Sequence, residues 1–501
     1  MASTGLPELI EFASQLEEPQ LIRRLGIATG GVDPLGLRQI NFDLMDLVIP
    51  GLNNVARHIR PFTVIAWAWH RAALCASKTG RSNVVRSELQ DFVDRIEVIF
   101  AWSQFLRDSD ADLPGHDVLA PLVRAETYTF GGSEWKERCD KRRFSTALSA
   151  PVNYGPAVKA LGWIEPSVST PGAFKSTEMV KDALKAIDTT LGSSLAHPAF
   201  SNLGEITVSQ KQVKDWADRM AIEQPSVQEK AAMRESLSSD NAREELRQTV
   251  TTIAEIDRHR RHATDQVDIR SLLCREPSEF PHHVGFESVP ILWRLVQVRQ
   301  LFRLTLEALL HWIMIQLTGG PAQLSDLAET FLSETRKASA TKEWLSTIDV
   351  NAMSIPERIR TLEDSLSAKD SNLAKTIHAG LAVSLLETGS SPIHERSDRL
   401  PLKRAREEAA SLGTQSPVEF VKHILSSWVL GQHVYWSVGR GLADARSNGR
   451  TILRLKVVLE EGLWTLAPGA APNFANPPRA TPDRLATLTN LMREAGSLKI
   501  H

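Results

Sequence analysis

The chain has little cysteine and little net charge. Its 501 residues include 3 cysteines, Cys75, Cys139 and Cys274, which are too few and too widely spaced for a disulfide framework. A net charge of -2 gives no overall field that would draw the protein to nucleic acid or to an anionic membrane. These absences predict a cytoplasmic protein, in which any binding of a charged partner depends on a local patch.

The sequence also lacks the common catalytic motifs. Phosphate loops, dinucleotide-binding glycine motifs, metalloprotease helices and nucleophile elbows do not occur. The adjacent His282 and His283 have no acid or cysteine at ligand spacing, so we expect neither a metal site nor a cofactor. One fragment is typical of a nuclease, because Asp117, Glu134 and Lys136 are the residue types that hold Mg²⁺ and activate water. A divergent metal-dependent nuclease is therefore an alternative function.

What the sequence does contain is a long apolar segment with helical period, from Ile291 to Thr318. Apolar residues occupy most faces of this predicted helix, which indicates a helix nearly surrounded by protein. The exceptions Arg303, Glu307 and His311 follow one another at four-residue spacing. This spacing predicts a narrow polar stripe that faces solvent or a groove.

The segment contains two further arginines. Arg299 lies at the edge of the predicted stripe, and Arg294 lies well away from it. Each must extend its charged end to water or pair with a carboxylate from another element. Charged residues at these positions would be costly inside a bilayer, so the segment is not expected to span a membrane.

The remaining pattern predicts a mainly α, multi-domain protein with a small winged-helix-like α+β segment and a C-terminal β-hairpin. The winged-helix-like order consists of a helix at 154–161, strands at 163–165 and 173–175, and a helix at 176–191, and an ordinary α+β subdomain is the alternative. The hairpin is expected from strands at 451–459 and 463–466. The predicted division comprises an N-terminal helical domain (1–125), the winged-helix-like segment (126–195), a central helical domain (196–387), a linker (388–417) and a C-terminal helix-hairpin-helix unit (418–501).

Two groups of basic residues are candidates for contact with nucleic-acid phosphates. One group precedes the winged-helix-like helix, and the other lies in the C-terminal unit beside few acidic residues; the members are Lys141, Arg142 and Arg143, and Arg440, Arg446, Arg450, Arg454 and Lys456. Local clusters of this kind bind the backbone of double-stranded DNA, and they also dock acidic proteins. The sequence leaves both partners open.

One block in the N-terminal part carries a resemblance to a known group of proteins. The segment Asp33-Pro34-Leu35-Gly36 is followed by Pro50-Gly51, by Arg57 and Arg60, and by an apolar helix with Trp67. This order resembles the N-terminal signature of uncharacterised bacterial proteins encoded in phage-defence islands. The resemblance implies a subunit of an antiviral defence complex, with partner subunits such as an ATPase and a nuclease, and it transfers no catalytic residue.

Arg57 and Arg60 directly precede that apolar helix. They are expected either to bond carbonyl groups and acids, or to hold a phosphate or a partner's carboxylate. Together with the basic groups, the resemblance implies a non-catalytic DNA-sensing or scaffold subunit of a bacterial anti-phage defence complex. A pure protein-protein adaptor is the second alternative beside the nuclease.

Overall fold

The computed structural model describes residues 26–27, 33–80, 84–108, 112–114, 125–141, 148, 150, 153–239, 242–259, 265–275, 288–368, 372–388, 399–448 and 452–498. Within these ranges the protein is mainly helical with small two-stranded sheets, which confirms the predicted fold class. The chain divides into two compact units, each built from segments distant in sequence. Unit 1 comprises Met1–Leu44 and Val267–Thr481, and unit 2 comprises Met45–Gln266 and Pro482–His501.

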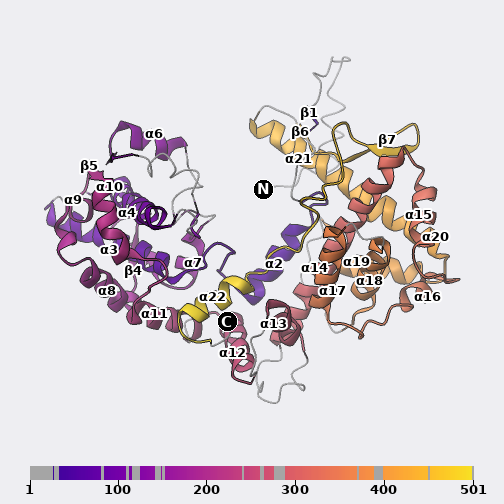
Figure 1. Ribbon diagram of the computed structural model, residues 1–501, viewed down its shortest axis with the longest axis horizontal. Coiled ribbons are helices and arrows are strands. Elements are labelled where there is room, and N and C mark those ends of the chain that lie inside the picture. The colour runs from indigo at the N-terminus through magenta and orange to yellow at the C-terminus, as the bar shows by residue number, and fades with distance from the viewer. Residues whose placement is uncertain are drawn as a thin grey trace. The chain divides into compact units, whose positions relative to one another are not determined.

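The elements of unit 1 surround one long helix. Helices α2 (Arg38–Val48) and α13 (Gln266–Leu273) contain the points where the chain passes between the units. The other elements of unit 1 are β1 (Gly26–Ile27), α14 (Ser288–Gln316), α15 (Leu324–Ser333), α16 (Thr341–Ser346), α17 (Ile355–Ser367), α18 (Leu373–Leu386), α19 (Leu402–Ser411), α20 (Pro417–His423), a π-helix (Ile424–Gly431), α21 (Gln432–Asn448), β6 (Ile452–Leu453), β7 (Val457–Glu460) and β8 (Leu463–Leu466). Figure 1 shows α14 beside α17 and α18, which pack against it.

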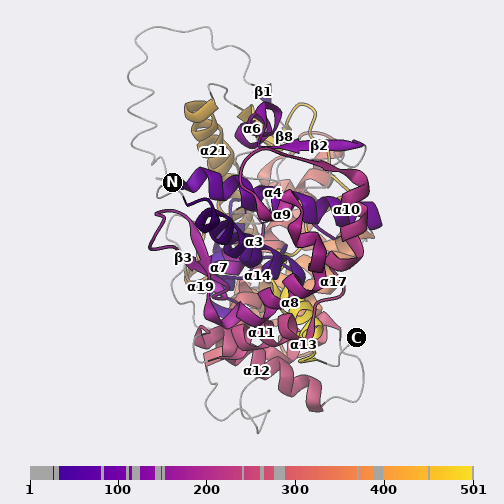
Figure 2. The same ribbon diagram turned by 90° about the vertical axis from the view of Figure 1, so that its left-hand side faces the viewer.

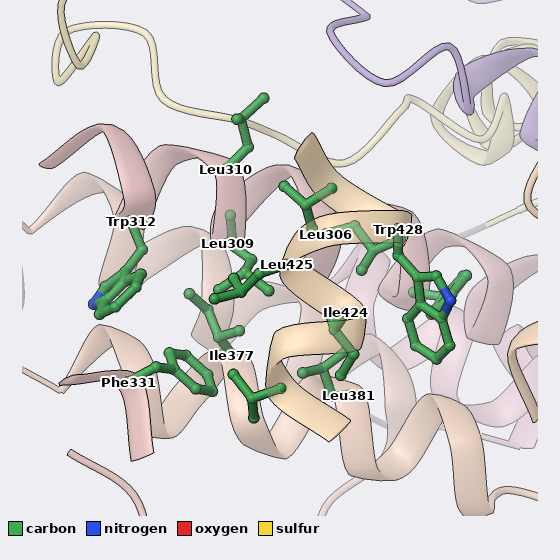
Figure 3. Packing of buried hydrophobic residues seen from close by; sticks show 14 of the residues in the cluster. Leu306, Leu309, Leu310, Trp312, Phe331, Ile377, Leu381, Ile424, Leu425 and Trp428 are labelled. Carbon is green, nitrogen blue, oxygen red and sulfur yellow. The ribbon is translucent and has the colours of Figure 1, made fainter. Parts of the chain in front are cut away.

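The predicted central helix is confirmed as α14. Its apolar side chains pack against α17, α18 and the π-helix, and Trp312, 2% exposed, contacts Phe331 edge to face at 5.2 Å between ring centres. Figure 3 shows Trp312 and Phe331 together, with Leu309 and Ile377 nearby. No described helix is long and apolar enough to cross a membrane.

The predicted polar stripe on α14 is wrong. Arg303, Glu307 and His311 are 0%, 1% and 5% exposed, because α2 and the segment after β8 cover this face of the helix. Arg294 pairs with Glu387 at 2.6 Å between Nε and Oε1, which is one of the two arrangements expected for it. Arg299, fully buried, donates to the carbonyl oxygen of Leu400 at 2.9 Å.

The predicted linker 388–417 contains a packed helix. In α19, Leu402, Ala405 and Ala409 are buried in the same core as α14, and the Glu408 carboxylate accepts from the indole of Trp428 at 2.7 Å. The mixed-charge pattern indicated a linker because only one narrow face of α19 is apolar. The described part of this segment belongs to unit 1.

Unit 2 is built around α3 (Ile59–Lys78) and α4 (Arg86–Arg107), which pack against each other (Figure 2). Its other elements are β2 (Thr127–Phe130), α6 (Ser133–Lys141), α7 (Gly155–Ala160), β3 (Ile164–Pro166), β4 (Phe174–Ser176), α8 (Lys181–Leu191), α9 (Pro198–Ser201), β5 (Ile206–Ser209), α10 (Gln210–Ala217), α11 (Val227–Ser238), α12 (Glu244–His259) and α22 (Leu485–Glu494). Reciprocal side-chain caps begin α10, at Ser209 and Gln212, and α11, at Ser226 and Glu229. Between α2 and α3, the Asn53 side chain accepts from the backbone N–H groups of Val55 and Ala56, and residues 52–58 are not helical.

The order of helix, strand, turn, strand and helix predicted for 154–191 is present in unit 2. The strands β3 and β4 pair antiparallel, and Glu165 and Lys175 form an ion pair across them at 2.9 Å. Helix α7 is only 6 residues long, and the ammonium group of Lys159 lies 4.3 Å from the ring centre of Phe174. The sequence did not predict the pairing of β2 with β5, whose strands are far apart in the chain.

The C-terminal hairpin is confirmed as β7 and β8, with Glu461 and Gly462 in its turn at positive φ. The first strand is shorter than predicted, because Ile452 and Leu453 pair in parallel with β1 instead. Arg454 and Lys456 therefore lie in the connection between β6 and β7.

Candidate anion-binding site

The turn Asp33–Gly36, which opens the block with the family resemblance, is held by side chains from another part of unit 1. Its four carbonyl oxygens accept hydrogen bonds in order from Trp436 Nε1 at 3.0 Å, His433 Nδ1 at 2.8 Å, Gln432 Nε2 at 2.8 Å and Arg399 Nη1 at 2.6 Å. Three of these donors lie on the first turns of α21. These four hydrogen bonds fix the position of the turn that leads into α2.

Gly36 is required in this turn for two reasons. Its φ of +70° lies in the left-handed region, and an added Cβ would come within 2.4 Å of the Trp436 ring. The Arg399 guanidinium stacks on the same indole, 4.1 Å from the ring centre. The Asp33 carboxylate accepts from the backbone N–H groups of Leu37 and Arg38, at 3.0 Å and 3.3 Å, and so starts α2.

His433 joins the turn to the connection between β6 and β7. Its Nδ1 bonds the carbonyl oxygen of Pro34, which cannot donate, and its Nε2 accepts from the backbone N–H of Lys456 at 2.9 Å. The ring is therefore neutral with its proton on Nδ1. Burial lowers the pKa of His433 to about 4. Ser437 adds a bond to the carbonyl oxygen of Arg454 at 3.0 Å.

These contacts enclose a pocket, which we call the basic pocket. Its lining residues come from the Asp33–Gly36 turn, from α21 and from the connection before β7; they are Asp33, Pro34, Trp436, Ser437, Arg440, Arg454 and Lys456. Arg440 is exposed, whereas Arg454 and Lys456 are half-buried. Three cationic side chains from two elements thus lie around one carboxylate and one indole.

A buried ion cluster, which we define as Arg38, Arg303 and Glu307, lies beside the basic pocket. Glu307 pairs with Arg303 at 2.7 Å and with Arg38 at 3.5 Å. Arg303 also donates to the carbonyl oxygen of Arg479 at 2.7 Å. Arg303 and Glu307 lie on α14, and Arg38 lies on α2. The cluster therefore connects α14 to the helix that follows the Asp33–Gly36 turn.

The charges of the pocket and the cluster influence one another. Burial, and next the negative charge of Glu307, raise the pKa of Asp33 above its usual value. Burial lowers the pKa of Lys456, against the opposite effect of Glu307. Among the described residues of the pocket and the cluster, the cations are Arg38, Arg303, Arg440, Arg454 and Lys456, and the carboxylates are Asp33 and Glu307. The cations Arg440, Arg454 and Lys456 in its lining make the basic pocket a candidate site for an anion.

The structure brings together part of the basic group that the sequence indicated. Arg440, Arg454 and Lys456 line the basic pocket. The side chain of Arg446 and all of Arg450 lie outside the described residues, as do the side chain of Lys141 and all of Arg142 and Arg143.

The two N-terminal arginines belong to unit 2, and their contacts follow the first of the two expected roles. Arg60 is 5% exposed; it pairs with Glu229 at 3.0 Å and donates to backbone carbonyl groups. Arg57 is exposed and pairs with Asp112 at 3.3 Å. Both arginines thus have carboxylate partners within unit 2.

Among the described residues, no arrangement of side chains supports the nuclease alternative. Glu134 and Lys136 are exposed on α6, and Asp117 lies outside the described residues. Within the described ranges, no group of three or more histidine, cysteine, aspartate or glutamate side chains is arranged to hold a metal ion.

Trp436, His433 and Asp33 are site residues that sequence reasoning did not select. The available signal was the Asp33-Pro34-Leu35-Gly36 segment, since its glycine indicates a special backbone conformation. Nothing in the sequence indicates that hydrogen-bond donors about 400 residues later bind this turn. Comparison with protein-family models, with curated proteins and with solved structures finds no match to this chain.

Proposed function

We propose that this protein is a non-catalytic DNA-binding subunit of a bacterial anti-phage defence assembly, and that the basic pocket contacts DNA phosphate. The observation that carries the proposal is the convergence of Arg440, Arg454 and Lys456 on one pocket. Arg440 lies on α21, and Arg454 and Lys456 lie in the connection before β7. The fold brings these three side chains to one pocket.

The cations of the pocket are of the types that bind phosphate. Arginine binds phosphate oxygens through two parallel N–H donors, and lysine adds a compact point charge. Trp436 donates its N–H to the carbonyl oxygen of Asp33, and Arg399 stacks on its ring, so the indole forms part of the pocket wall. Nucleic acid carries a phosphate at every nucleotide, so it supplies the group that these cations bind.

The defence context rests on the N-terminal resemblance. The segment that opens this resemblance, Asp33–Gly36, also supplies one wall of the basic pocket. A subunit that binds DNA but lacks a catalytic centre would recruit or position partner subunits, such as an ATPase and a nuclease.

Binding of the purified chain to a fluorescent duplex tests this proposal. We expect binding at about 50 mM salt and much weaker binding at about 200 mM, because association releases cations condensed on the DNA and this release is less favourable at higher salt. Arg454→Ala and Arg440→Ala should each weaken binding at the lower salt. The matched control is Lys403→Ala, which removes a 70% exposed cation on α19.

Absence of duplex binding at the lower salt would remove DNA from the account and favour the adaptor. An equal loss of affinity in the Lys403→Ala control would show that general charge, and not the pocket, governs binding. Incubation of the same duplex with Mg²⁺ examines the nuclease alternative, for which cleavage abolished by Glu134→Ala is the required result.

A further inference from the structure

We infer that residues 471–476 form a lid over the polar face of α14, and that this lid opens in the folded protein to give solvent access to His311. The lid belongs to the segment after β8, in which residues 467–481 form neither helix nor strand. The movement is independent of DNA binding, so its failure would leave the proposed function standing.

The lid lies between two fixed ends. Before it, the buried Ala467 donates its N–H to a carbonyl oxygen in the connection before β7, at 3.0 Å. After it, Pro477 is buried, and the carbonyl oxygen of Arg479 accepts from Arg303 at 2.7 Å. The residues between these ends, 471–476, are all exposed or half-buried. The ends can therefore stay in place while the lid moves.

One aromatic ring of the lid covers His311. Phe474 is half-buried and contacts the imidazole edge to face, at 5.4 Å between ring centres. His311 is 5% exposed, and its Nε2 is buried without a hydrogen-bond partner among the described residues. A buried polar atom without a hydrogen bond carries a desolvation penalty, which contact with water removes. Hydration of this nitrogen thus offsets part of the cost of moving Phe474 away.

The face beneath the lid can tolerate water because it is polar. Glu307 lies one turn before His311 on α14, and it pairs with Arg303 at 2.7 Å and with Arg38 of α2 at 3.5 Å. The charge of Lys456, from the connection before β7, also acts on His311. Water that reaches these groups hydrates them, whereas water against an apolar face would oppose opening.

Acylation of histidine by diethyl pyrocarbonate tests the inference on the full chain, because this reagent modifies neutral imidazoles that it can reach. Mass spectrometry of peptides follows His311 beside His378 and His433, which are 1% and 0% exposed. His378 stacks on Trp344, and both ring nitrogens of His433 are hydrogen-bonded. We expect His311 to react roughly ten-fold faster than these two, since a local opening requires less free energy than unfolding of the core.

Phe474→Ala should increase the rate at His311 by roughly a further ten-fold, as for the loss of one aromatic contact, and should leave His378 and His433 unchanged. The matched control is Asn476→Ala, which removes an exposed side chain of the lid and should keep all three rates near the wild-type values. In the wild type, reaction of His311 as slow as that of His378 and His433 would overturn the lid. An equal increase at all three histidines in Phe474→Ala would assign the access to global unfolding and would also overturn it.

Discussion

Trp436 donates its indole N–H to the carbonyl oxygen of Asp33 at 3.0 Å, and Gly36 lies against the same ring. This pair of contacts joins a turn before α2 to a helix about 400 residues later. It also forms the wall of the basic pocket, so the stability of the turn and the shape of the pocket depend on the same residues.

Gly36→Ala should destabilise unit 1 by roughly 2 to 4 kcal/mol, from the strained backbone and the overlap with the Trp436 ring. Urea unfolding followed by fluorescence measures the change. The matched control is Gly462→Ala, which has a φ of +83° but no heavy atom within 4 Å of the added Cβ. The Gly462→Ala substitution should lower the free energy of unfolding by only about 1 to 2 kcal/mol. Equal effects of the two substitutions would mean that the close approach to Trp436 is unimportant.

Trp312→Ala should destabilise the protein by roughly 3 to 5 kcal/mol, because it removes a large buried side chain and leaves a cavity beside Phe331. The free energy of unfolding from urea titration gives the value. Leu459→Ala, at a position 56% exposed on β7, should change stability by less than about 0.5 kcal/mol. A small effect at Trp312 would contradict the packing of α14 shown in Figure 3.

The sequence predicted α14 well but misjudged its polar face, and the reason is physical. Residues at four-residue spacing on a helix lie on one side whether that side faces water or another element. The pattern of Arg303, Glu307 and His311 therefore predicts a stripe without indicating its exposure. Burial was decided by α2 and the segment after β8, which lie far from α14 in the chain.

Other differences arise from long-range pairing and local chemistry. The pairing of β2 with β5 and of β1 with β6 joins short strands that carry no recognisable partner signal. By contrast, the β7–β8 hairpin was predictable, because Glu461 and Gly462 mark a turn between adjacent strands. The same contrast applies to the site: Arg440, Arg454 and Lys456 were found from charge, while His433 and Trp436 depended on the fold.

Glu307→Gln should destabilise unit 1 by roughly 3 to 5 kcal/mol, because it leaves the fully buried Arg303 without its carboxylate. The double substitution Arg303→Met with Glu307→Leu should recover much of the loss, since it removes both buried charges. Urea unfolding of the single and double variants forms the test. Glu407→Gln, in an exposed pair with Lys403, is the control and should cost less than about 1 kcal/mol. A double variant no more stable than Glu307→Gln would argue against this account of the cluster.

Stability should fall as the pH decreases from about 7 towards 4, because neutral histidines are buried in unit 1. Burial, and then the charge of Lys456, lower the pKa of His311 to about 4. The unfolded chain takes up this proton near pH 6.5 and the folded chain near 4, so the unfolded state gains protons first. His311→Leu should flatten the decrease measured between pH 7 and 5. Part of it should persist, since burial also lowers the pKa of His378 and His433 to about 4. An unchanged pH dependence in the variant would contradict the buried neutral state of His311.

The salt dependence of duplex binding tests the central claim most directly. Affinities of the wild type, Arg440→Ala, Arg454→Ala and the Lys403→Ala control are measured at several salt concentrations between about 50 and 200 mM. If the basic pocket contacts phosphate, the slope of log K against log salt should become shallower by about 0.9 for each pocket cation removed. The control should keep the wild-type slope. Wild-type slopes in both pocket variants, or no duplex binding by the wild type, would contradict the assignment of the basic pocket to DNA.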